Sequence, residues 1–221
     1  DHQGTNPFAN LSLANTSHFV NEGIYTHSGS GGGQISGSGS VTNTGTFART
    51  GTGDQLISSV FNNRGTVANN SASSVFFNNG GADLNATYQP NAGLIGFGGG
   101  ARTVSGSSAV EAGAGAVNFN GATVTFGPGT TYGNVDTTVS GGTVNFSTGN
   151  TVTLDRLTLT AGTLGGSDNI DVVNTLVFNG STVRGTGVLT NLPGSTATLG
   201  AINNTATPVS YTHLRAHETR C

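Results

Sequence analysis

The stretch that decides the fold is TVNFSTGNTVTLDRLTLTAGTL, from Thr143 to Leu164. Within it, short runs of β-branched and aliphatic residues alternate with Gly, Asn and Ser, which is the pattern of short strands separated by turns. No segment of the chain shows a 3.6-residue apolar period with helix caps, so we predict an all-β fold. The apolar members of the short runs are Val144, Phe146, Val152, Leu154, Leu157 and Leu159.

The same pattern recurs about every twenty residues, and such a fixed period is the signature of a repeat architecture. A column of Thr precedes most of the repeated apolar residues, and Asp83 interrupts this column. The column of repeated apolar residues and the column of Thr together predict one register along nearly the whole chain. The repeated apolar residues, here called anchors, are Tyr25, Phe47, Val67, Leu84, Val104, Val124, Val144, Leu164, Val183 and Ile202. The Thr column consists of Thr46, Thr66, Thr103, Thr123, Thr143, Thr163 and Thr182.

This period predicts a parallel β-solenoid with about twenty residues per coil, in which neighbouring coils hydrogen-bond at a spacing of ~4.8 Å. Residues 1–207 then form a single β-solenoid domain of roughly ten coils, a fragment that is open at both ends. Its stability comes from inward apolar side chains, each contributing ~1.5–3 kcal/mol on burial. We expect Gly and Asn at the corners, and we expect stacked Asn side chains to pair their amides between coils.

The charge content is low: 8% of the residues are charged, and the formal net charge is −3. There is no basic patch, so nucleic acid is not an expected partner. No apolar run is long enough to cross a bilayer, and we therefore expect no membrane insertion by this segment.

The carboxylates give no predicted catalytic residue. A catalytic pair needs carboxyl groups within about 5–10 Å of each other. Asp54, Glu111 and Asp171 share the same offset from their anchors, but their coils are about three apart. Asp136 is expected to stack on Arg156, and we interpret this as a surface ion pair that stabilises weakly at best.

The one candidate metal site is the loop LGGSDNIDV, from Leu164 to Val172. Asp168, Asn169 and Asp171 supply oxygen ligands of the kind that Ca²⁺ prefers, so calcium is the one candidate cofactor. The loop departs from the repeat-type calcium motif and occurs only once. The alternative, which this single occurrence favours, is a polar corner with Asp and Asn in turn positions.

The histidines form no predicted metal site. His18 and His27 flank one repeat unit without a third ligand, and we expect both at the surface.

The end of the chain differs in composition from the rest. The stretch VSYTHLRAHET, from Val209 to Thr219, resembles the conceptual translation of a transposase adapter that is used to prepare sequencing libraries. We therefore expect residues 208–221 to be a non-native tail. For the same reason we assign no metal site to His213 and His217 and no reactive thiol to Cys221.

Several segments resemble repeats of large exported bacterial proteins, namely filamentous-haemagglutinin-like adhesins and autotransporter passengers. These segments are VTNTGTFARTGTG, FNNRGTV, LTLTAGTLGGSDNIDV and GGTVNFSTGNTVTL, and the resemblance covers Phe19 to Asn191. It implies a right-handed parallel β-helix that is secreted or on the cell surface, beyond the outer membrane of a Gram-negative-type bacterium. It carries over no catalytic residue.

The expected function is a structural or adhesive rod, with host or matrix glycans or proteins as partners. The alternative is a β-helix carbohydrate-active enzyme, either a polysaccharide lyase or a glycoside hydrolase. A groove lined by two or more carboxylates would support the enzyme, whereas flat Thr and Asn ladders would support the rod.

Overall fold

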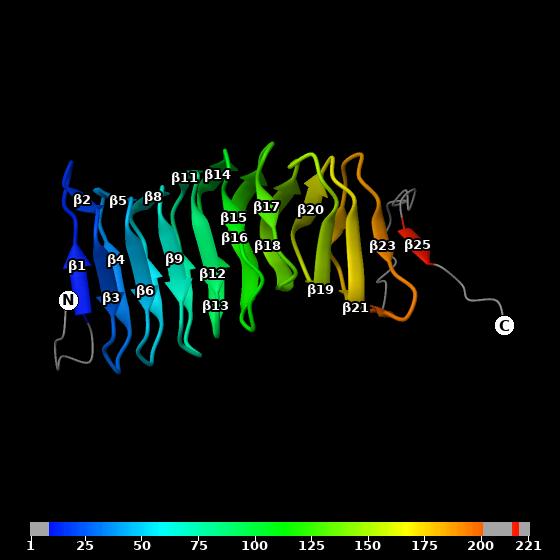
Figure 1. Ribbon diagram of the computed structural model, residues 1–221, viewed down its shortest axis with the longest axis horizontal. Coiled ribbons are helices and arrows are strands. Elements are labelled where there is room, and N and C mark those ends of the chain that lie inside the picture. The colour runs from blue at the N-terminus through cyan, green and yellow to red at the C-terminus, as the bar shows by residue number, and fades with distance from the viewer. Residues whose placement is uncertain (1–8, 201–213, 217–221) are drawn as a thin grey trace.

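The computed structural model describes residues 9–200 and 214–216. In this part of the chain all regular elements are β-strands, and all paired strands run parallel. The strands stack as a β-solenoid of about 10 turns with about 20 residues per turn. Successive coils follow one another along the long axis in Figure 1. The predicted all-β parallel solenoid is therefore confirmed.

The strands of each coil stack on those of the next coil into three faces. Face A contains β1 (Ala9–Ser12), β4 (Gly33–Ser36), β7 (Gln55–Ile57), β10 (Val75–Phe77), β13 (Leu94–Phe97) and β24 (Thr196–Leu199). Face B contains β2 (His18–Asn21), β5 (Ser40–Asn43), β8 (Val60–Asn63), β11 (Gly81–Leu84), β14 (Ala101–Ser105), β20 (Thr163–Gly166) and β22 (Thr182–Val183). Face C contains β3 (Ile24–His27), β6 (Thr46–Arg49), β9 (Thr66–Asn69), β12 (Thr87–Pro90), β15 (Ala109–Val110), β17 (Thr131–Tyr132), β23 (Leu189–Asn191) and β25 (Leu214–Ala216).

Four longer strands bend around a corner and so belong to two faces. The strands β16 (Ala116–Phe126) and β18 (Asp136–Phe146) pass from face A to face B, with a register shift at the bend. The strands β19 (Val152–Leu159) and β21 (Ile170–Phe178) pass from face C to face A. The corner residues therefore continue the sheet instead of forming separate loops.

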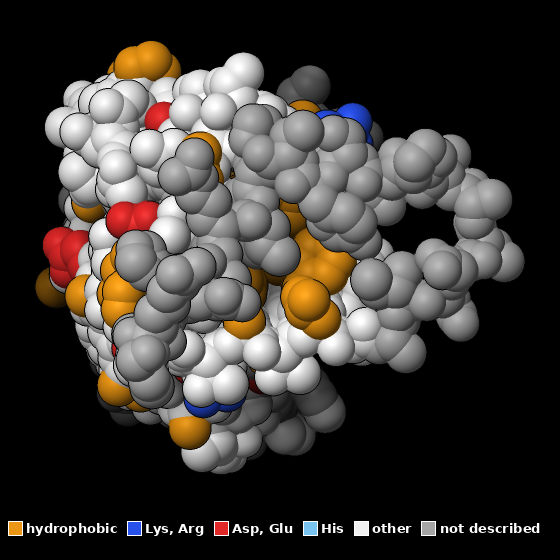
Figure 2. Space-filling model, turned by 90° about the vertical axis from the view of Figure 1, so that its right-hand side faces the viewer, with side chains coloured by type: hydrophobic (Ala, Val, Ile, Leu, Met, Phe, Trp, Pro, Cys, Tyr) orange, Lys and Arg blue, Asp and Glu red, His pale blue; other side chains and the backbone are white. Residues whose placement is uncertain are grey.

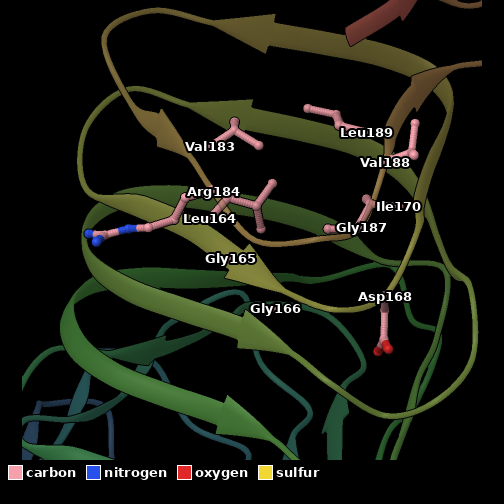
Figure 3. A pocket seen from close by; sticks show the side chains of 10 residues that line it. All are labelled: Leu164, Gly165, Gly166, Asp168, Ile170, Val183, Arg184, Gly187, Val188 and Leu189. Atoms are coloured by element: carbon pink, nitrogen blue, oxygen red, sulfur yellow. The ribbon is translucent and has the colours of Figure 1, made fainter. Parts of the chain in front are cut away.

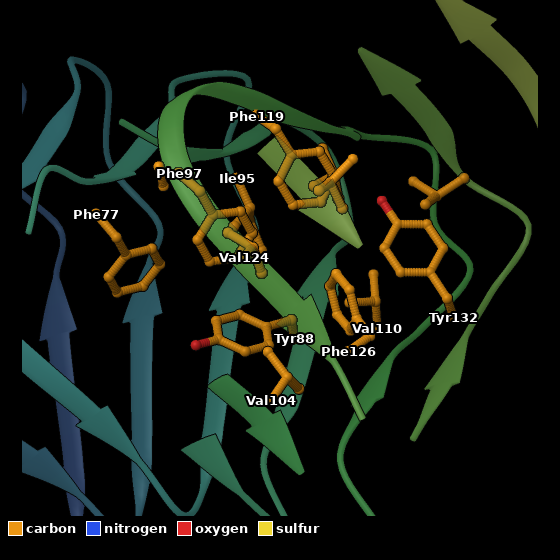
Figure 4. Packing of buried hydrophobic residues seen from close by; sticks show 14 of the residues in the cluster. Phe77, Tyr88, Ile95, Phe97, Val104, Val110, Phe119, Val124, Phe126 and Tyr132 are labelled. Atoms are coloured by element: carbon orange, nitrogen blue, oxygen red, sulfur yellow. The ribbon is translucent and has the colours of Figure 1, made fainter. Parts of the chain in front are cut away.

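The interior is a continuous column of apolar side chains, because alternate residues of every face point inward. Aromatic rings stack along it: Phe97 lies 5.7 Å from Phe77 and 5.4 Å from Phe119 between ring centroids, with interplanar angles of 20° and 13°. Figure 4 shows these rings with Tyr88 and Tyr132 beside them. Further along, Phe126 stacks on Phe146 at 5.2 Å. A coil cannot bury its own inner side chains, so each coil depends on its neighbours.

The predicted register is confirmed over the downstream coils. Val124, Val144, Leu164 and Val183 pair in sequence on face B and line one column. The segments Leu157–Val172 and Leu176–Asn191 also align without a gap, since Leu157 pairs with Leu176 and Ile170 pairs with Leu189.

Two anchors were placed wrongly. Val104 is buried but pairs with Phe126, while Arg102 occupies the position next to Val124. The coil between them is two residues longer than the twenty-residue period, which shifts the register. Leu84 is 38% exposed, and Asp83 takes the inward position beside it.

The single register was also wrong, because the upstream anchors lie on a different face from the downstream ones. Tyr25, Phe47 and Val67 belong to a column of face C that continues through Tyr88, Val110 and Tyr132. Thr followed by an apolar residue occurs on face C in the upstream coils and on face B in the downstream coils, so two columns of similar sequence were joined into one. Ile202 lies outside the described residues.

Asparagines at the corner between faces B and C form the predicted amide ladder. The Asn21 side chain donates from Nδ2 to Oδ1 of Asn43 at 2.7 Å, and Asn43 donates to Asn63 in the same way at 2.8 Å. The amides of Asn21 and Asn43 also donate to the backbone oxygens of Thr46 and Thr66. Each Asn thus holds both its own corner and the corner of the next coil.

Candidate functional site

The three candidate calcium ligands face different groups. The Asp168 carboxylate accepts hydrogen bonds from the backbone nitrogen of Thr148 at 2.6 Å, from its hydroxyl at 2.7 Å and from the nitrogen of Gly149 at 3.1 Å. Asn169 Oδ1 instead accepts from the nitrogen of Val188, one coil further on, at 3.0 Å. The oxygens of these two neighbouring residues thus point in opposite directions along the rod.

Asp171 is on the outer side of β21, in register with Thr153 and Thr190 of the adjacent coils. Together with the bonds of Asp168 and Asn169, this describes a polar corner that ties three coils together. Calcium binding at this loop stays a prediction. It would have to replace protein donors that already satisfy the Asp168 oxygens.

A small hollow lies beside this corner between the last coils (Figure 3). Its volume is about 20 Å³, which is room for about one water molecule. In Figure 3 the Asp168 carboxylate points toward the preceding coil, and Arg184 points away from the interior. The hollow is therefore too small for an organic ligand. Its apolar lining consists of Leu164, Ile170, Val183, Val188 and Leu189.

A larger groove of about 370 Å³ lies at the corner between faces C and A. Two carboxylates line it, Asp136 from the start of β18 and Asp155 from the bend of β19. The two residues come from neighbouring coils, which are ~4.8 Å apart, and both line the same groove. The rest of the lining is Gly113, Ala114, Gly115, Asn134 and Val135.

The partners of both carboxylates are at the surface. Asp136 Oδ2 lies 3.8 Å from Arg156 Nε, and both side chains are about half exposed, so the predicted surface ion pair is confirmed. Asp155 accepts a hydrogen bond from the Asn174 amide of the next coil. Two carboxylates, a guanidinium and an amide of this kind can bind hydroxyl groups or exchange a proton with a ligand.

Sequence reasoning missed Asp155 because it compared residues only within one column. Asp155 precedes Arg156 at a register shift in β19, so it stands beside Asp136 and not directly above it. The adjacent Asp and Arg, one coil after Asp136, were the available signal. The groove meets the carboxylate criterion for the enzyme.

The other acidic residues compared in the sequence have local partners. Asp54 Oδ1 accepts from the nitrogen of Ser74 at 2.9 Å, and Glu111 Oε2 accepts from the Gln89 amide at 2.9 Å. These bonds connect adjacent coils at the corner between faces C and A and on face C.

One acidic residue is buried in the interior. Asp83 lies 2.7 Å from Arg102 in an ion pair whose side chains are 0% and 1% exposed, and Tyr88 donates its hydroxyl to the same carboxylate at 2.7 Å. The Arg102 guanidinium also stacks over Phe77 at 4.9 Å. Gly81 lies beside the ion pair: a Cβ there would lie 1.9 Å from the Phe61 backbone oxygen and 3.1 Å from Arg102 Nη1.

The pKa values of this cluster follow from its burial. Burial, reinforced by the charge of Asp83, raises the pKa of Tyr88 well above its usual value. Burial alone would lower the pKa of Arg102, but the charges and hydrogen bonds of Tyr88 and Asp83 outweigh it and raise the pKa overall. The cluster is closed to solvent, so its role is to hold coils together and not to meet a ligand.

A second arginine, Arg49, is buried at the corner between faces C and A. Its guanidinium donates only to backbone oxygens, among them that of His27 at 2.7 Å. Burial lowers the pKa of Arg49, although the charges of Asp54 and Tyr25 act against this. Arg49 is therefore a structural clamp on two corners. The acceptors are the backbone oxygens of His27, Gly29, Gly31, Thr52 and Gly53.

The surface position expected for His27 is wrong. His27 is 2% exposed, and it fits inside because Gly33 has no side chain: a Cβ there would lie 2.3 Å from the His27 ring. His18 is exposed as expected, and its Nδ1 lies 2.7 Å from the Ser40 hydroxyl. Within residues 9–200 no group of three or more His, Cys, Asp or Glu side chains is placed to hold a metal ion. His213, His217 and Cys221 lie outside the described residues.

The outer sides of faces B and C carry rows of Thr. On face B, Thr123, Thr143, Thr163 and Thr182 pair in sequence, and on face C Thr46, Thr66 and Thr87 do the same. Thr163 is buried, and Arg184 donates a hydrogen bond to its hydroxyl. The Thr residues form long neutral rows that run along the rod.

No helix in the described part of the chain could cross a membrane, since that part contains only strands. No protein-family model matches the chain, and comparisons with curated proteins and with solved structures give no significant match.

Proposed function

We propose that the chain is a segment of a secreted or cell-surface rod that is not catalytic and that presents its outer faces for adhesion or matrix contact. The single observation that carries this proposal is the combination of a sealed interior with flat, neutral faces. Core side chains fill the solenoid from Leu13 to Leu189, while rows of paired Thr residues run along the outer sides of faces B and C. Such a molecule gains length with each coil and exposes the same chemistry along that length.

The low charge of the faces supports an extracellular adhesive role. Of the described arginines, Arg49 and Arg102 are buried, so they add no charge to the surface. Figure 2 views the rod from its C-terminal end, where few Asp, Glu or Arg side chains are visible outside the grey regions. A face with hydroxyl and amide groups but few charges suits hydroxylated or neutral partners in a salt-rich medium, where surface charge pairs are screened.

Two measurements test the proposal on the purified chain. Small-angle X-ray scattering should give an elongated particle about 50 Å long over the solenoid, since about ten coils stack at ~4.8 Å. Immobilised protein should retain matrix glycans or matrix proteins, whereas a protein of similar size and charge should not. A globular scattering profile, or no retention of either class, would overturn the rod.

A second function is favoured by one observation, the groove that contains Asp136 and Asp155. Paired carboxylates next to an arginine are the machinery of many enzymes that cleave glycosidic bonds. In that case one carboxyl group protonates the leaving oxygen while the other activates water or attacks the sugar. The chain would then be a β-helix carbohydrate-active enzyme.

Activity measurements decide between the two functions. The wild-type chain is incubated with neutral and uronate-containing polysaccharides, and reducing ends and unsaturated products are measured. If the groove is catalytic, Asp136→Asn and Asp155→Asn should each lower the rate by at least about 100-fold. Asp171→Asn, a change of the same kind outside the groove, should leave the rate unchanged. No product with any substrate would leave the rod as the function.

A further inference from the structure

One aromatic side chain on the outside of the rod takes no part in the core. Phe76 is the central residue of β10, and its neighbours Val75 and Phe77 point inward. Among the described phenylalanines, Phe76 is the only one that neither belongs to or packs against the core cluster nor contacts another aromatic ring. Its side chain is partly exposed on face A. On the outer side of face A it lies between Leu56 of the preceding coil and Gly96 of the next one, and part of its ring stays open to solvent.

The coil above Phe76 is shaped to receive this ring. Phe76 pairs with Gly96, and a Cβ on Gly96 would lie 2.3 Å from the ring. The ring thus fills the side-chain position of Gly96 and lies flat along the face. Two residues on, Gly98 is also without a side chain, and the Oδ1 of Asn78 would lie 2.3 Å from a Cβ there. The Phe76 ring and the Asn78 amide therefore occupy the two places where side chains of the middle coil would stand.

Amide side chains lie around the Phe76 ring. Asn78 follows Phe76 by two residues and is exposed, so it lies on the same side of the face. On the third coil, Asn118 pairs with Gly96, and Asn120 follows it by two residues. Asn120 Oδ1 would lie 3.6 Å from a Cβ on Gly98. A ring and three carboxamides thus surround an area two coils long, or about 10 Å.

The residues of this patch carry no charge. An anionic or cationic ligand finds no counter-charge among them, and a protein partner would need an apolar patch of several hundred Å². Carboxamides both donate and accept hydrogen bonds, which suits the hydroxyl groups of a sugar. A phenyl ring offers an apolar platform for the C–H groups on one side of a sugar ring. The patch, here called the Phe76 patch, consists of Phe76, Asn78, Gly96, Gly98, Asn118 and Asn120.

We propose that the Phe76 patch is a binding site for a neutral glycan, with a sugar ring stacked on Phe76 and its hydroxyl groups bonded to Asn118 and the neighbouring amides. This inference rests on the proposed adhesive function and names the ligand class of one face. The ligand lies on the outer side of the Phe76 ring, which covers Gly96, and extends toward the amides of the third coil.

Affinity gel electrophoresis tests the site, with galactomannan, xyloglucan, mixed-linkage glucan and dextran as neutral probes and polygalacturonate and heparin as charged ones. We expect retardation by at least one neutral probe and a loss of about tenfold in affinity for Phe76→Ala. Phe76→Trp should retain binding, and Asn118→Ala should weaken it. Thr158→Ala is the matched control, since Thr158 lies on the same face outside the patch and its loss should change nothing.

The outcomes separate the site from the rod. Circular dichroism of each variant shows whether it is folded, and Phe76→Trp guards against a loss that comes from misfolding of Phe76→Ala. No retardation by any neutral probe, or equal retardation of wild type and folded Phe76→Ala, would overturn the Phe76 patch. The rod would remain if the wild-type chain is elongated and still binds a matrix. A compact particle that binds no matrix would instead overturn the proposed rod. The glycan assay alone would then decide whether the Phe76 patch is a binding site.

Discussion

Among single residues, the inward side chains of the solenoid carry most of its stability, and position in the column decides the effect of a substitution. Val144 is 0% exposed and lies between Val124 and Leu164 in its column. Asp136 is about half exposed and pairs with Arg156 at 3.8 Å. The two residues belong to the same strand, β18, so they provide a matched comparison.

We predict that Val144→Asp lowers the free energy of unfolding by about 3 kcal/mol or more, because it buries a charge without a partner. Asp136→Asn should change it by less than about 0.5 kcal/mol, since exposed ion pairs contribute little. Thermal melts followed by circular dichroism measure both. Equal melting temperatures for the two variants would contradict the inward position of Val144.

Tyr132 gives the chain a predicted dependence on alkaline pH. It is 8% exposed, burial raises its pKa above the ordinary 10.0, and its hydroxyl lies 3.0 Å from that of Thr137. In the unfolded chain the Tyr132 hydroxyl ionises near pH 10, whereas in the folded chain it stays neutral at that pH. The stabilisation is therefore complete below pH 10 and is lost as the pH rises toward the folded-state pKa, at about 1.4 kcal/mol per pH unit.

Urea denaturation at several pH values above 9 measures this loss. Tyr132→Phe should show a shallower decline of stability than the wild type, although it also loses one hydrogen bond. Burial also raises the pKa values of Tyr25 and Tyr88. The stability of the variant should therefore still decline in part as the pH rises. Identical slopes in wild type and variant would show that Tyr132 ionises as easily in the folded chain as in the unfolded one.

Inward residues of regular coils could be predicted from the sequence, because the period places them one above another. Val124, Val144 and Leu164 were found in this way. Asp83 and Arg102 were not, because their burial depends on each other and on Tyr88, and no local pattern encodes a pair formed between coils. His27 was missed for a similar reason, since its space comes from Gly33 in the next turn.

At the scale of elements, the corners between the faces repeat as regularly as the strands. The corners that contain a buried Asn show the reason. Asn43 is 0% exposed, accepts from Asn21 and donates both to Asn63 and to the backbone oxygen of Thr66. A polar group at this depth is tolerated because its bonds are made. The Asn of each Asn-x-Gly motif thus connects neighbouring coils by hydrogen bonds.

We predict that Asn43→Ala destabilises the chain by about 1–3 kcal/mol, because it removes the buried hydrogen bonds that connect Asn43 with Asn21, Asn63 and the Thr66 backbone oxygen. Asn70→Ala is the control: it removes an amide pair between Asn70 and Asn91 that is exposed, and it should cost less than about 0.5 kcal/mol. Hydrogen exchange should show faster opening of β5 and β8 in Asn43→Ala alone. Equal exchange in both variants would argue against the ladder.

The elements that sequence reasoning placed best were those with a strict period, and the corners with inserted residues were placed worst. Asn85 adopts a left-handed conformation with φ of 54° next to the exposed Leu84, where the twenty-residue spacing fails. The bend in β19 likewise moves Asp155 beside Asp136. Insertions and bulges change which residues meet without changing the apolar pattern, so the carboxylate groove could not be read from spacing.

For the whole molecule, the paired strands belong to neighbouring coils, and Arg102 reaches further, to the Phe61 oxygen two coils away. Outside that region, the number of coils can therefore change without a change of fold. We predict that deleting Thr123 to Gly142 yields a folded rod that is about 4.8 Å shorter. Thr123 pairs with Thr143, so the deletion removes one complete coil and joins positions that are in register. Deleting Thr123 to Tyr132 instead removes half a coil and should unfold the downstream part.

Circular dichroism and X-ray scattering distinguish these results. The complete-coil deletion should keep a cooperative melt, lowered by a few degrees at most, and a shortened scattering profile. The half-coil deletion should lose both. A folded rod from both deletions would mean that coils find new partners freely and that register is not specified.

At this scale the sequence predicted the architecture but neither ligand nor chemistry. A period of about twenty residues predicts a solenoid, because a single coil cannot bury its inward apolar residues and must stack on neighbouring coils. The Phe76 patch and the carboxylate groove depend on residues of three successive coils, such as Phe76, Gly96 and Asn118. Their meeting follows from the exact length of each coil, which a degenerate repeat does not reveal.

The buried pair of Asp83 and Arg102 has a consequence for how such a chain evolves. Ordinary coils are interchangeable, so unequal recombination within the gene can duplicate or remove them without harm. The coils of Asp83 and Arg102 are different, because each charge is stable only beside the other at 2.7 Å. A copied Asp83 coil without its arginine would be eliminated by selection. We therefore expect the two coils that hold this pair to be kept together in the gene. Duplications and losses of whole coils are expected to accumulate on either side of them.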